Sequence, residues 1–165
     1  MDKKSSMILD VIQRLKHATG RAPCKKTVQK VVYLLEEAEE SPEFDYTIHF
    51  YGPYSADLDY EIQDLAAQGV LNIDYTDRGH FISVNDTDEM GDVQLSVREQ
   101  EIIDSFGKES PSKLELVATT LFVQRAKNAT DTSQILPGVK KIKGSKYSDR
   151  EICDAIGELH SQNYF

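Results

Sequence analysis

Apolar side chains recur at helical spacing along the first forty residues of the chain. Between residues 5 and 18 they stand three or four positions apart, which predicts a helix, and Gly20 follows as a stop signal. A second stripe of the same spacing reaches Ala38, and Pro23 predicts the opening of its helix. The acidic end of this stripe is broken at Ser41-Pro42.

The next forty residues mix strand and helix patterns. Residues 44–51 alternate apolar and polar side chains, which predicts a half-buried strand that ends at Gly52-Pro53. Ser55 is placed to cap a third helix over residues 55–68. Two short apolar runs around a Gly-containing turn then predict a hairpin within residues 70–84. The order helix, helix, strand, helix, hairpin is typical of a winged helix-turn-helix.

The rest of the chain is predicted to be helical. Four cap signals introduce its helices: Ser96 with Glu99, Ser110 before Pro111, Asp131 with Gln134, and Ser148 with Glu151. We expect Pro137-Gly138 to interrupt the short helix after Asp131.

The predicted fold is therefore mainly α with a small β element, in the α+β class. A winged helix-turn-helix half over residues 1–84 is followed by a helical half over residues 95–165 that packs against it. Residues 85–94 are acidic and without periodicity, so they are interpreted as a linker.

Charge is unevenly distributed over the 165 residues, whose formal net charge is −9. Residues 1–30 carry eight basic and two acidic residues, residues 31–110 carry three basic and 20 acidic residues, and residues 111–165 carry eight basic and six acidic residues. The chain lacks the overall positive charge of a typical nucleic-acid binder, and the blocks predict one basic and one acidic face.

No set of residues indicates an enzyme. The four histidines lie far apart in sequence, and Cys24 has no positioned base beside it. We therefore expect no catalytic residue, no metal and no cofactor. No apolar run reaches the roughly 18 residues of a membrane span, and no basic leader precedes a short apolar stretch, so we expect a cytoplasmic protein without membrane contact.

The predicted third helix is a poor reader of DNA. It carries Asp57, Glu61 and Asp64 and contains neither Lys nor Arg, so it would repel a polyanion. Directly before it, Tyr51-Gly52-Pro53-Tyr54 forms a tight bend whose two tyrosines suit a protein contact, or alternatively pack inward to fix the corner.

If nucleic acid is bound, other cations must do it. Candidates are the residues of the predicted wing tip and of the basic run in the second half: Arg78, His80, Lys140, Lys141, Lys143 and Lys146. The basic run can equally be the favourable charge at the end of a helix.

Two short motifs resemble a known family. The segments Lys26-Thr-Val-Gln-Lys-Val-Val-Tyr33 and Phe50-Tyr-Gly-Pro-Tyr-Ser-Ala-Asp-Leu58 resemble those of the YwgA-like family and, more distantly, of the Panacea (SocA-like) antitoxin domain. Val28 replaces the usual Leu, and the chain has no Trp, which is common in Panacea domains. The resemblance implies a non-enzymatic regulatory domain whose matching positions are Gln29, Lys30, Tyr33, Tyr51, Gly52, Pro53 and Tyr54.

Two hypotheses follow. The first is an antitoxin-like or adaptor-like module that holds a basic protein, such as a toxin or a regulated protein, through the acidic third helix and the tyrosine corner. The alternative is a transcriptional regulator that binds DNA as a homodimer through the winged helix.

Overall fold

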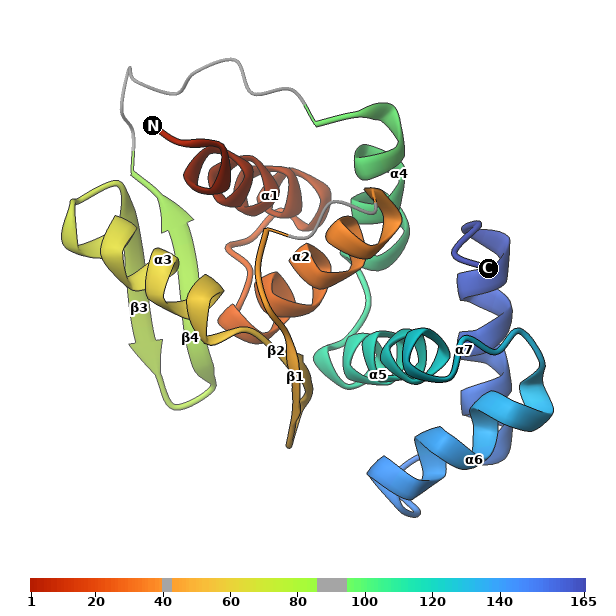
Figure 1. The fold of residues 1–165 in the computed structure, drawn as a ribbon. Helices are drawn as coiled ribbons and strands as arrows, with labels where there is room; N and C mark the ends of the chain where they lie inside the picture. Colours follow the sequence, from red (N-terminus) through yellow and green to blue (C-terminus); the bar gives the residue numbers. More distant parts are fainter. Residues whose placement is uncertain (40–42, 86–94) are drawn as a thin grey trace.

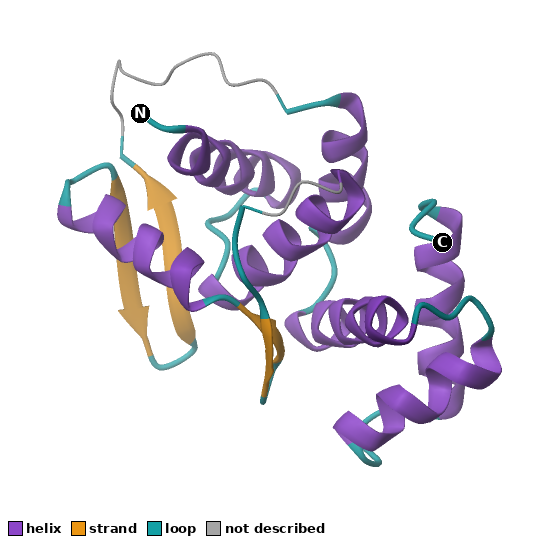
Figure 2. Cartoon of the chain, viewed as in Figure 1, coloured by secondary structure: helices purple, strands orange, loops and turns teal. Residues whose placement is uncertain are grey.

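A computed structural model describes residues 1–39, 43–85 and 95–165 (Figures 1 and 2). This part of the chain forms seven helices and two antiparallel two-stranded sheets, which places it in the α+β class with helix predominant. In chain order the elements are α1 (Lys3–Thr19), α2 (Lys25–Glu39), β1 (Thr47–His49), β2 (Gly52–Tyr54), α3 (Ala56–Ala67), β3 (Leu71–Thr76), β4 (Gly79–Val84), α4 (Val97–Phe106), α5 (Pro111–Lys127), α6 (Thr132–Lys143) and α7 (Asp149–Ser161).

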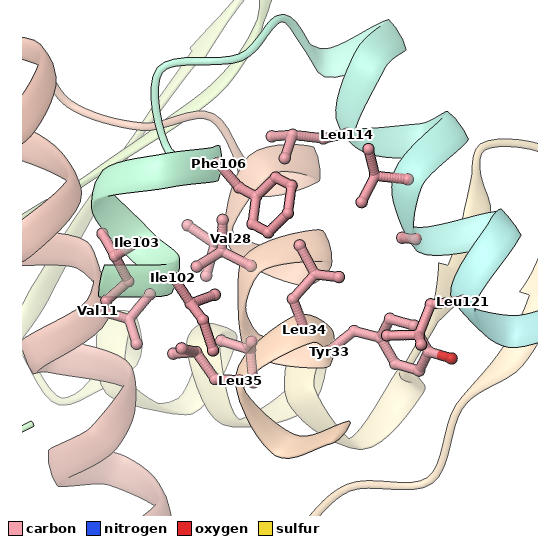
Figure 3. Close-up of a cluster of buried hydrophobic side chains, with 14 of the residues drawn as sticks. Val11, Val28, Tyr33, Leu34, Leu35, Ile102, Ile103, Phe106, Leu114 and Leu121 are labelled. Atoms are coloured by element: carbon pink, nitrogen blue, oxygen red, sulfur yellow. The ribbon is translucent and has the colours of Figure 1, made fainter. Parts of the chain in front are cut away.

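Helix α2 is the central element of the fold. It packs against α1, α4, α5, β2 and β4, so most of its circumference is buried. Figure 3 shows side chains of α1, α4 and α5 meeting those of α2, with Leu34 and Leu35 among them. A helix that is apolar on most sides is stable only inside a core, which explains why two halves of the chain close around it.

The predicted helix starts are confirmed at four serines, because cap chemistry is local. Ser55 and Ser110 accept hydrogen bonds from the third residue of α3 and of α5, and Ser96 and Ser148 form complete capping boxes at α4 and α7. The predicted end of α2 at Ser41-Pro42 lies outside the described residues.

Helix α6 differs from the prediction. It runs through Pro137 without interruption, and Asp131 makes no side-chain cap bond. Pro137 stands inside the helix and removes a single backbone hydrogen bond, and Ile135 and Val139 of α6 are fully buried in compensation. Packing therefore outweighs the local helix-breaking signal.

The strand predicted over residues 44–51 is confirmed only over Thr47–His49, which form β1. The chain then turns at Phe50-Tyr51 into a hairpin, in which β1 pairs with β2 and Ile48 lies opposite Pro53. Gly52 adopts a φ of +98°, a conformation that favours glycine and lets the chain reverse here. The alternating pattern of the sequence continues through Phe50 and Tyr51, so it does not show that the strand ends at His49 and that a turn follows.

The β3–β4 hairpin is confirmed, but Pro23 does not open α2. The carbonyl of Pro23 accepts a hydrogen bond of 2.9 Å from the backbone of Ile82, and Cys24 forms an isolated bridge with Phe81. The segment before α2 therefore extends the β3–β4 sheet by a short third piece, and α2 begins at Lys25.

The second half of the chain packs on the first through α4, which contacts α1 and α2, and through α5. Helix α5 contacts α2 and β2 on one side and carries α6 and α7 on the other, and the buried cluster contains residues of both halves (Figure 1). The predicted boundary stays a prediction, because residues 86–94 of the expected linker lie outside the described residues. Among the described residues, no helix combines the length and apolar character that crossing a bilayer requires.

Two helical glycines offer a matched test of this packing. A Cβ added at Gly138 of α6 would lie 2.6 Å from Cγ1 of Val123, whereas nothing lies within 4 Å of one added at Gly157 of α7. Alanine gains about 1 kcal/mol over glycine in a helix, but overpacking against a stiff β-branched side chain costs about 1–3 kcal/mol. Gly138→Ala should lower the free energy of unfolding and Gly157→Ala should raise it, as measured by urea denaturation. Equal effects of the two substitutions would contradict the close α5–α6 contact.

Candidate functional site

The bend before α3 is fixed to α2 by one side-chain amide. Gln29 donates a hydrogen bond of 2.9 Å from Nε2 to the carbonyl of Ser55 and accepts one of 3.0 Å at Oε1 from the Ser55 backbone N–H. The hydroxyl of Ser55 in turn accepts from the N–H of Leu58 and caps α3. Gln29 therefore sets where α3 begins.

Lys30 completes this clamp one residue later. Its Nζ donates a 3.0 Å hydrogen bond to the carbonyl of Pro53, and the residue is only 4% exposed. Burial lowers the pKa of Lys30 to about 8, and the carboxylate of Glu115 opposes this shift. A Cβ at Gly52 would lie 3.3 Å from Cε of Lys30, so the hairpin backbone approaches α2 more closely than a larger residue allows.

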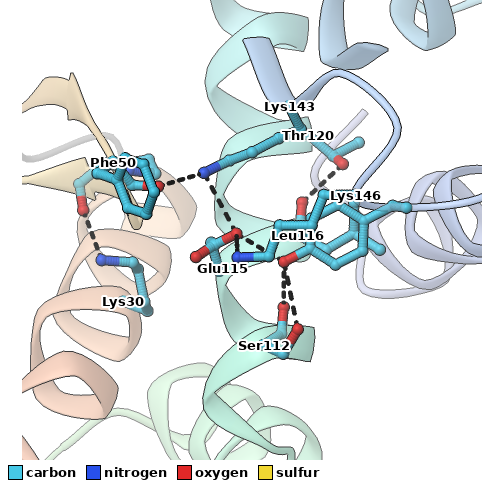
Figure 4. A network of polar contacts seen from close by, with 10 residues as sticks. Lys30, Phe50, Ser112, Glu115, Leu116, Thr120, Lys143 and Lys146 are labelled. Atoms are coloured by element: carbon cyan, nitrogen blue, oxygen red, sulfur yellow. Dashed lines mark hydrogen bonds and ion pairs between the residues drawn. The ribbon is translucent and has the colours of Figure 1, made fainter.

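A buried carboxylate ties the same hairpin to the second half of the chain (Figure 4). Oε2 of Glu115 on α5 lies 2.7 Å from Nζ of Lys146, 2.6 Å from the hydroxyl of Tyr147 and 3.2 Å from Nζ of Lys143. Lys143 also donates a 2.8 Å hydrogen bond to the carbonyl of Phe50 in the hairpin turn. Burial raises the pKa of Glu115, but the hydrogen bonds from these partners outweigh burial and hold its pKa below the usual value.

In front of the clamp lies a cleft of about 510 Å³, here named the basic-aromatic cleft. Five segments form it: the start of α2, the β1–β2 hairpin, Asp59 of α3, the β3–β4 turn and the first residue of α5. Its lining residues are Cys24, Lys25, Lys26, Gln29, Lys30, His49, Phe50, Tyr51, Gly52, Tyr54, Asp59, Arg78, Gly79, His80 and Pro111.

The basic-aromatic cleft is electropositive although the chain as a whole is acidic. Nζ of Lys26 lies 3.5 Å from the ring centroid of Tyr51, close enough for a cation–π interaction. Lys25 is neutralised by Asp59 at 2.6 Å, and Asp59 is the one carboxylate in the described lining. A smaller cavity of about 190 Å³ adjoins the cleft and extends it toward Lys146.

The acidic residues of α3 lie on a different face. Asp57 and Asp64 are exposed and Glu61 is half-buried, at spacings that align the three along one side of the helix. Tyr60 stands beside this row and is 71% exposed. The first hypothesis from the sequence placed the tyrosine corner and the acidic helix on one surface. In the structure the surroundings of these two features differ in charge.

The motif residues are divided between interior and surface. Tyr33 is buried and stacks edge-on against Tyr46 at 4.9 Å, far along α2 from the cleft. Of the corner, Gly52 and Pro53 are buried, Tyr54 is half-buried and Tyr51 is exposed. Direct contact of the buried positions with a partner stays a prediction, whereas their contacts within the chain give them a structural role.

The candidate nucleic-acid-binding cations are not gathered on one face. Arg78 and His80 line the basic-aromatic cleft, and Lys146 reaches the adjoining cavity. Lys143 is held inside by Glu115, and Lys140 pairs with Asp149 at 2.6 Å on the surface. Lys141 is exposed.

Sequence reasoning missed several residues of the cleft. Lys25 and Lys26 were visible only as part of a basic block, and His49 and Phe50 were assigned to a single strand. The signal that could have placed them is Gly52 directly after two aromatic residues, which is compatible with a turn. No cluster of three or more potential metal-ligating side chains is found within the described ranges.

At the far end of α2, Glu36 lies buried among aromatic residues. Its Oε1 accepts a 3.0 Å hydrogen bond from the backbone of Glu43, while Oε2 and the hydroxyl of Tyr46 have no hydrogen-bond partner among the described residues. Burial raises the pKa of Glu36 to about 7, although the bond from Glu43 opposes the shift.

The comparison with known proteins supports the resemblance stated above in its coarser form. No family model matches the chain. The chain is 27% identical over 145 residues to the uncharacterized protein YwgA of Bacillus subtilis (strain 168), across 84% of this chain and 86% of that protein. The chain is thus similar to YwgA over most of its length. The more distant similarity to the Panacea domain stays a prediction.

Removing the amide of Gln29 should destabilise the chain. Gln29→Met keeps the volume but leaves the backbone N–H of the fully buried Ser55 without a partner, at about 1–3 kcal/mol, while the Ser55 carbonyl keeps the hydrogen bond from the N–H of Asp59. We expect the free energy of unfolding to fall by about 1–3 kcal/mol in urea titrations. Gln63→Met, an exposed position on α3, is the matched control and should change it by less than about 0.5 kcal/mol.

The pKa of Glu36 predicts a pH-dependent stability. Its folded pKa of about 7 lies above the usual 4.5, so the folded state binds the extra proton and loses stability as the pH rises through this range. The free energy of unfolding of Glu36→Gln, relative to that of the wild type, should therefore increase between pH 4.5 and pH 7, by at most about 3 kcal/mol. Urea titrations at several pH values measure this difference. A difference independent of pH would contradict the burial of this carboxylate.

Proposed function

We propose that this chain is a non-enzymatic regulatory module of the winged-helix type that binds a basic protein partner through α3. The order α1, α2, α3 and the β3–β4 hairpin supports the winged-helix arrangement, with β3–β4 as the wing. The pairing of the Pro23–Cys24 segment with β4 supports it further, because it joins the start of α2 to the wing.

The observation that carries this proposal is the outer face of α3. In a winged helix this element faces the partner, and here it presents Asp57, Glu61 and Asp64 with no cation in the helix to neutralise them. The exposed ring of Tyr60 beside the row supplies the aromatic anchor that protein interfaces favour. Electrostatic attraction would speed association with a basic surface and make it sensitive to salt.

The similarity to YwgA names neither a function nor a partner, because YwgA is itself uncharacterized. The resemblance to the Panacea domain adds the antitoxin-like or adaptor-like role and a toxin or a regulated protein as partner. A cytoplasmic location belongs to the same proposal.

DNA binding is the second candidate, and the lining of the basic-aromatic cleft by Arg78 and His80 favours it. The four carboxylates of α3 and its lack of Lys and Arg oppose docking in a major groove. The remaining cations lie in ion pairs or on a separate surface, so they add no continuous path for a phosphate backbone.

Charge reversal on α3 tests the proposal. Asp57→Lys, Glu61→Lys and Asp64→Lys together should abolish capture of a native partner by the immobilised chain at low salt, and added salt should weaken capture by the wild type. The matched control reverses three carboxylates of other surfaces, Glu101, Glu109 and Asp154, with the same change in net charge.

Quantitative mass spectrometry of the retained proteins compares the two triple variants. A protein that is lost with the α3 variant and kept with the control supports the proposal. Equal retention by both variants, or sequence-specific DNA binding that Arg78→Glu removes, would reject it.

A further inference from the structure

The basic-aromatic cleft has the size and shape of a small-molecule site. Its volume of about 510 Å³ falls within the roughly 300–1,000 Å³ of typical ligand pockets. Walls from five separate segments line it, and the Gln29–Ser55 and Lys30–Pro53 hydrogen bonds hold one of these walls rigidly against α2. A site that is already formed binds its ligand without the free-energy cost of ordering flexible segments.

The charged residues that line the cleft favour the binding of an anionic ligand. Four cationic side chains line it, namely Lys25, Lys26, Lys30 and Arg78, against the single carboxylate of Asp59. Lys25 is paired with Asp59, and none of the described carboxylates lies within ion-pairing distance of Lys26 or Arg78. A guanidinium and an ammonium across one cleft suit the oxygens of a phosphate group.

The aromatic residues of the cleft favour a ligand that carries a planar group next to its anionic group. Phe50 is 81% exposed at the tip of the hairpin, an unusual exposure for so large an apolar ring. Tyr51 next to it is exposed and lies under Lys26. Exposed ring faces next to cations are the arrangement on which nucleobases stack while their phosphates are held.

We propose that the basic-aromatic cleft binds a nucleoside phosphate. Arg78 and Lys26 hold the phosphate, Phe50 stacks on the base, and Tyr51, whose ring stands at 80° to that of Phe50, contacts the edge of the base. The site lies apart from the acidic face of α3, so it stands whether or not that face binds a protein. A duplex would need cations spread over a wider surface, and an acidic peptide would leave the paired aromatic rings unexplained.

Calorimetric titration of the full chain tests this assignment. The ligands are AMP and ATP. Adenosine and inorganic pyrophosphate are titrated separately, as the nucleoside half and the phosphate half of a nucleotide. At least one nucleotide should bind saturably with a Kd below about 1 mM, and each half should bind about tenfold more weakly or not at all. Arg78→Glu and Phe50→Ala should each weaken nucleotide binding about tenfold. Lys141→Glu, an exposed cation of α6 away from the cleft, should leave it unchanged.

Cys24 offers an independent readout because it lines the cleft, whereas the other cysteine, Cys153, is exposed on α7. In a Cys153→Ser background, bound nucleotide should slow the reaction of the Cys24 thiol with a thiol-specific reagent. Absence of both saturable binding and protection would overturn the proposal. So would nucleotide affinity unaffected by Arg78→Glu, pyrophosphate binding equal to that of ATP, or binding confined to oligonucleotides.

Discussion

The hydrogen bonds that join the side chains of Gln29 and Lys30 to the backbone of residues 53–55 are the constraint on which both candidate surfaces depend. They place a charged and an amide side chain inside the core, and such burial is costly unless every polar atom finds a partner. Here the partners are the backbone of the hairpin and of the α3 cap. One wall of the basic-aromatic cleft and the starting point of α3 are thereby fixed by two consecutive residues of the same helix.

The part of this architecture that could be predicted from the sequence is the part governed by neighbouring residues. Ser55, Ser96 and Ser148 cap their helices through contacts three residues away, so their signals are complete in the sequence. The β1–β2 hairpin escaped prediction because the alternating pattern continues through Phe50 and Tyr51 of its turn and because Gly52-Pro53, which begins β2, is typical of a strand end. The prediction that α6 is interrupted at Pro137 was wrong, because the burial of α6 against α5 depends on residues that are distant in the sequence.

The cleft could not be predicted for a related reason. Lys26, Phe50 and Arg78 come from three segments far apart in the chain, and each is unremarkable where it stands in the sequence. Their meeting follows from the clamp on α2, from the extension of the β3–β4 sheet by Pro23 and Cys24, and from the turn before Gly52. The outcome is a small region of positive potential beside a helix of negative potential, with the Lys25–Asp59 ion pair at the border between them.

The hydrogen bond from Lys143 to the carbonyl of Phe50 has a mechanical consequence. It couples the end of α6, 93 residues further along the chain, to the tip of the hairpin that forms the rim of the cleft. Since Glu115 holds the same ammonium from α5, the second half of the chain acts as a brace for that rim. A shift of α6 would pull on the hairpin tip directly, so the width of the opening is set by helices that contribute almost nothing to its lining.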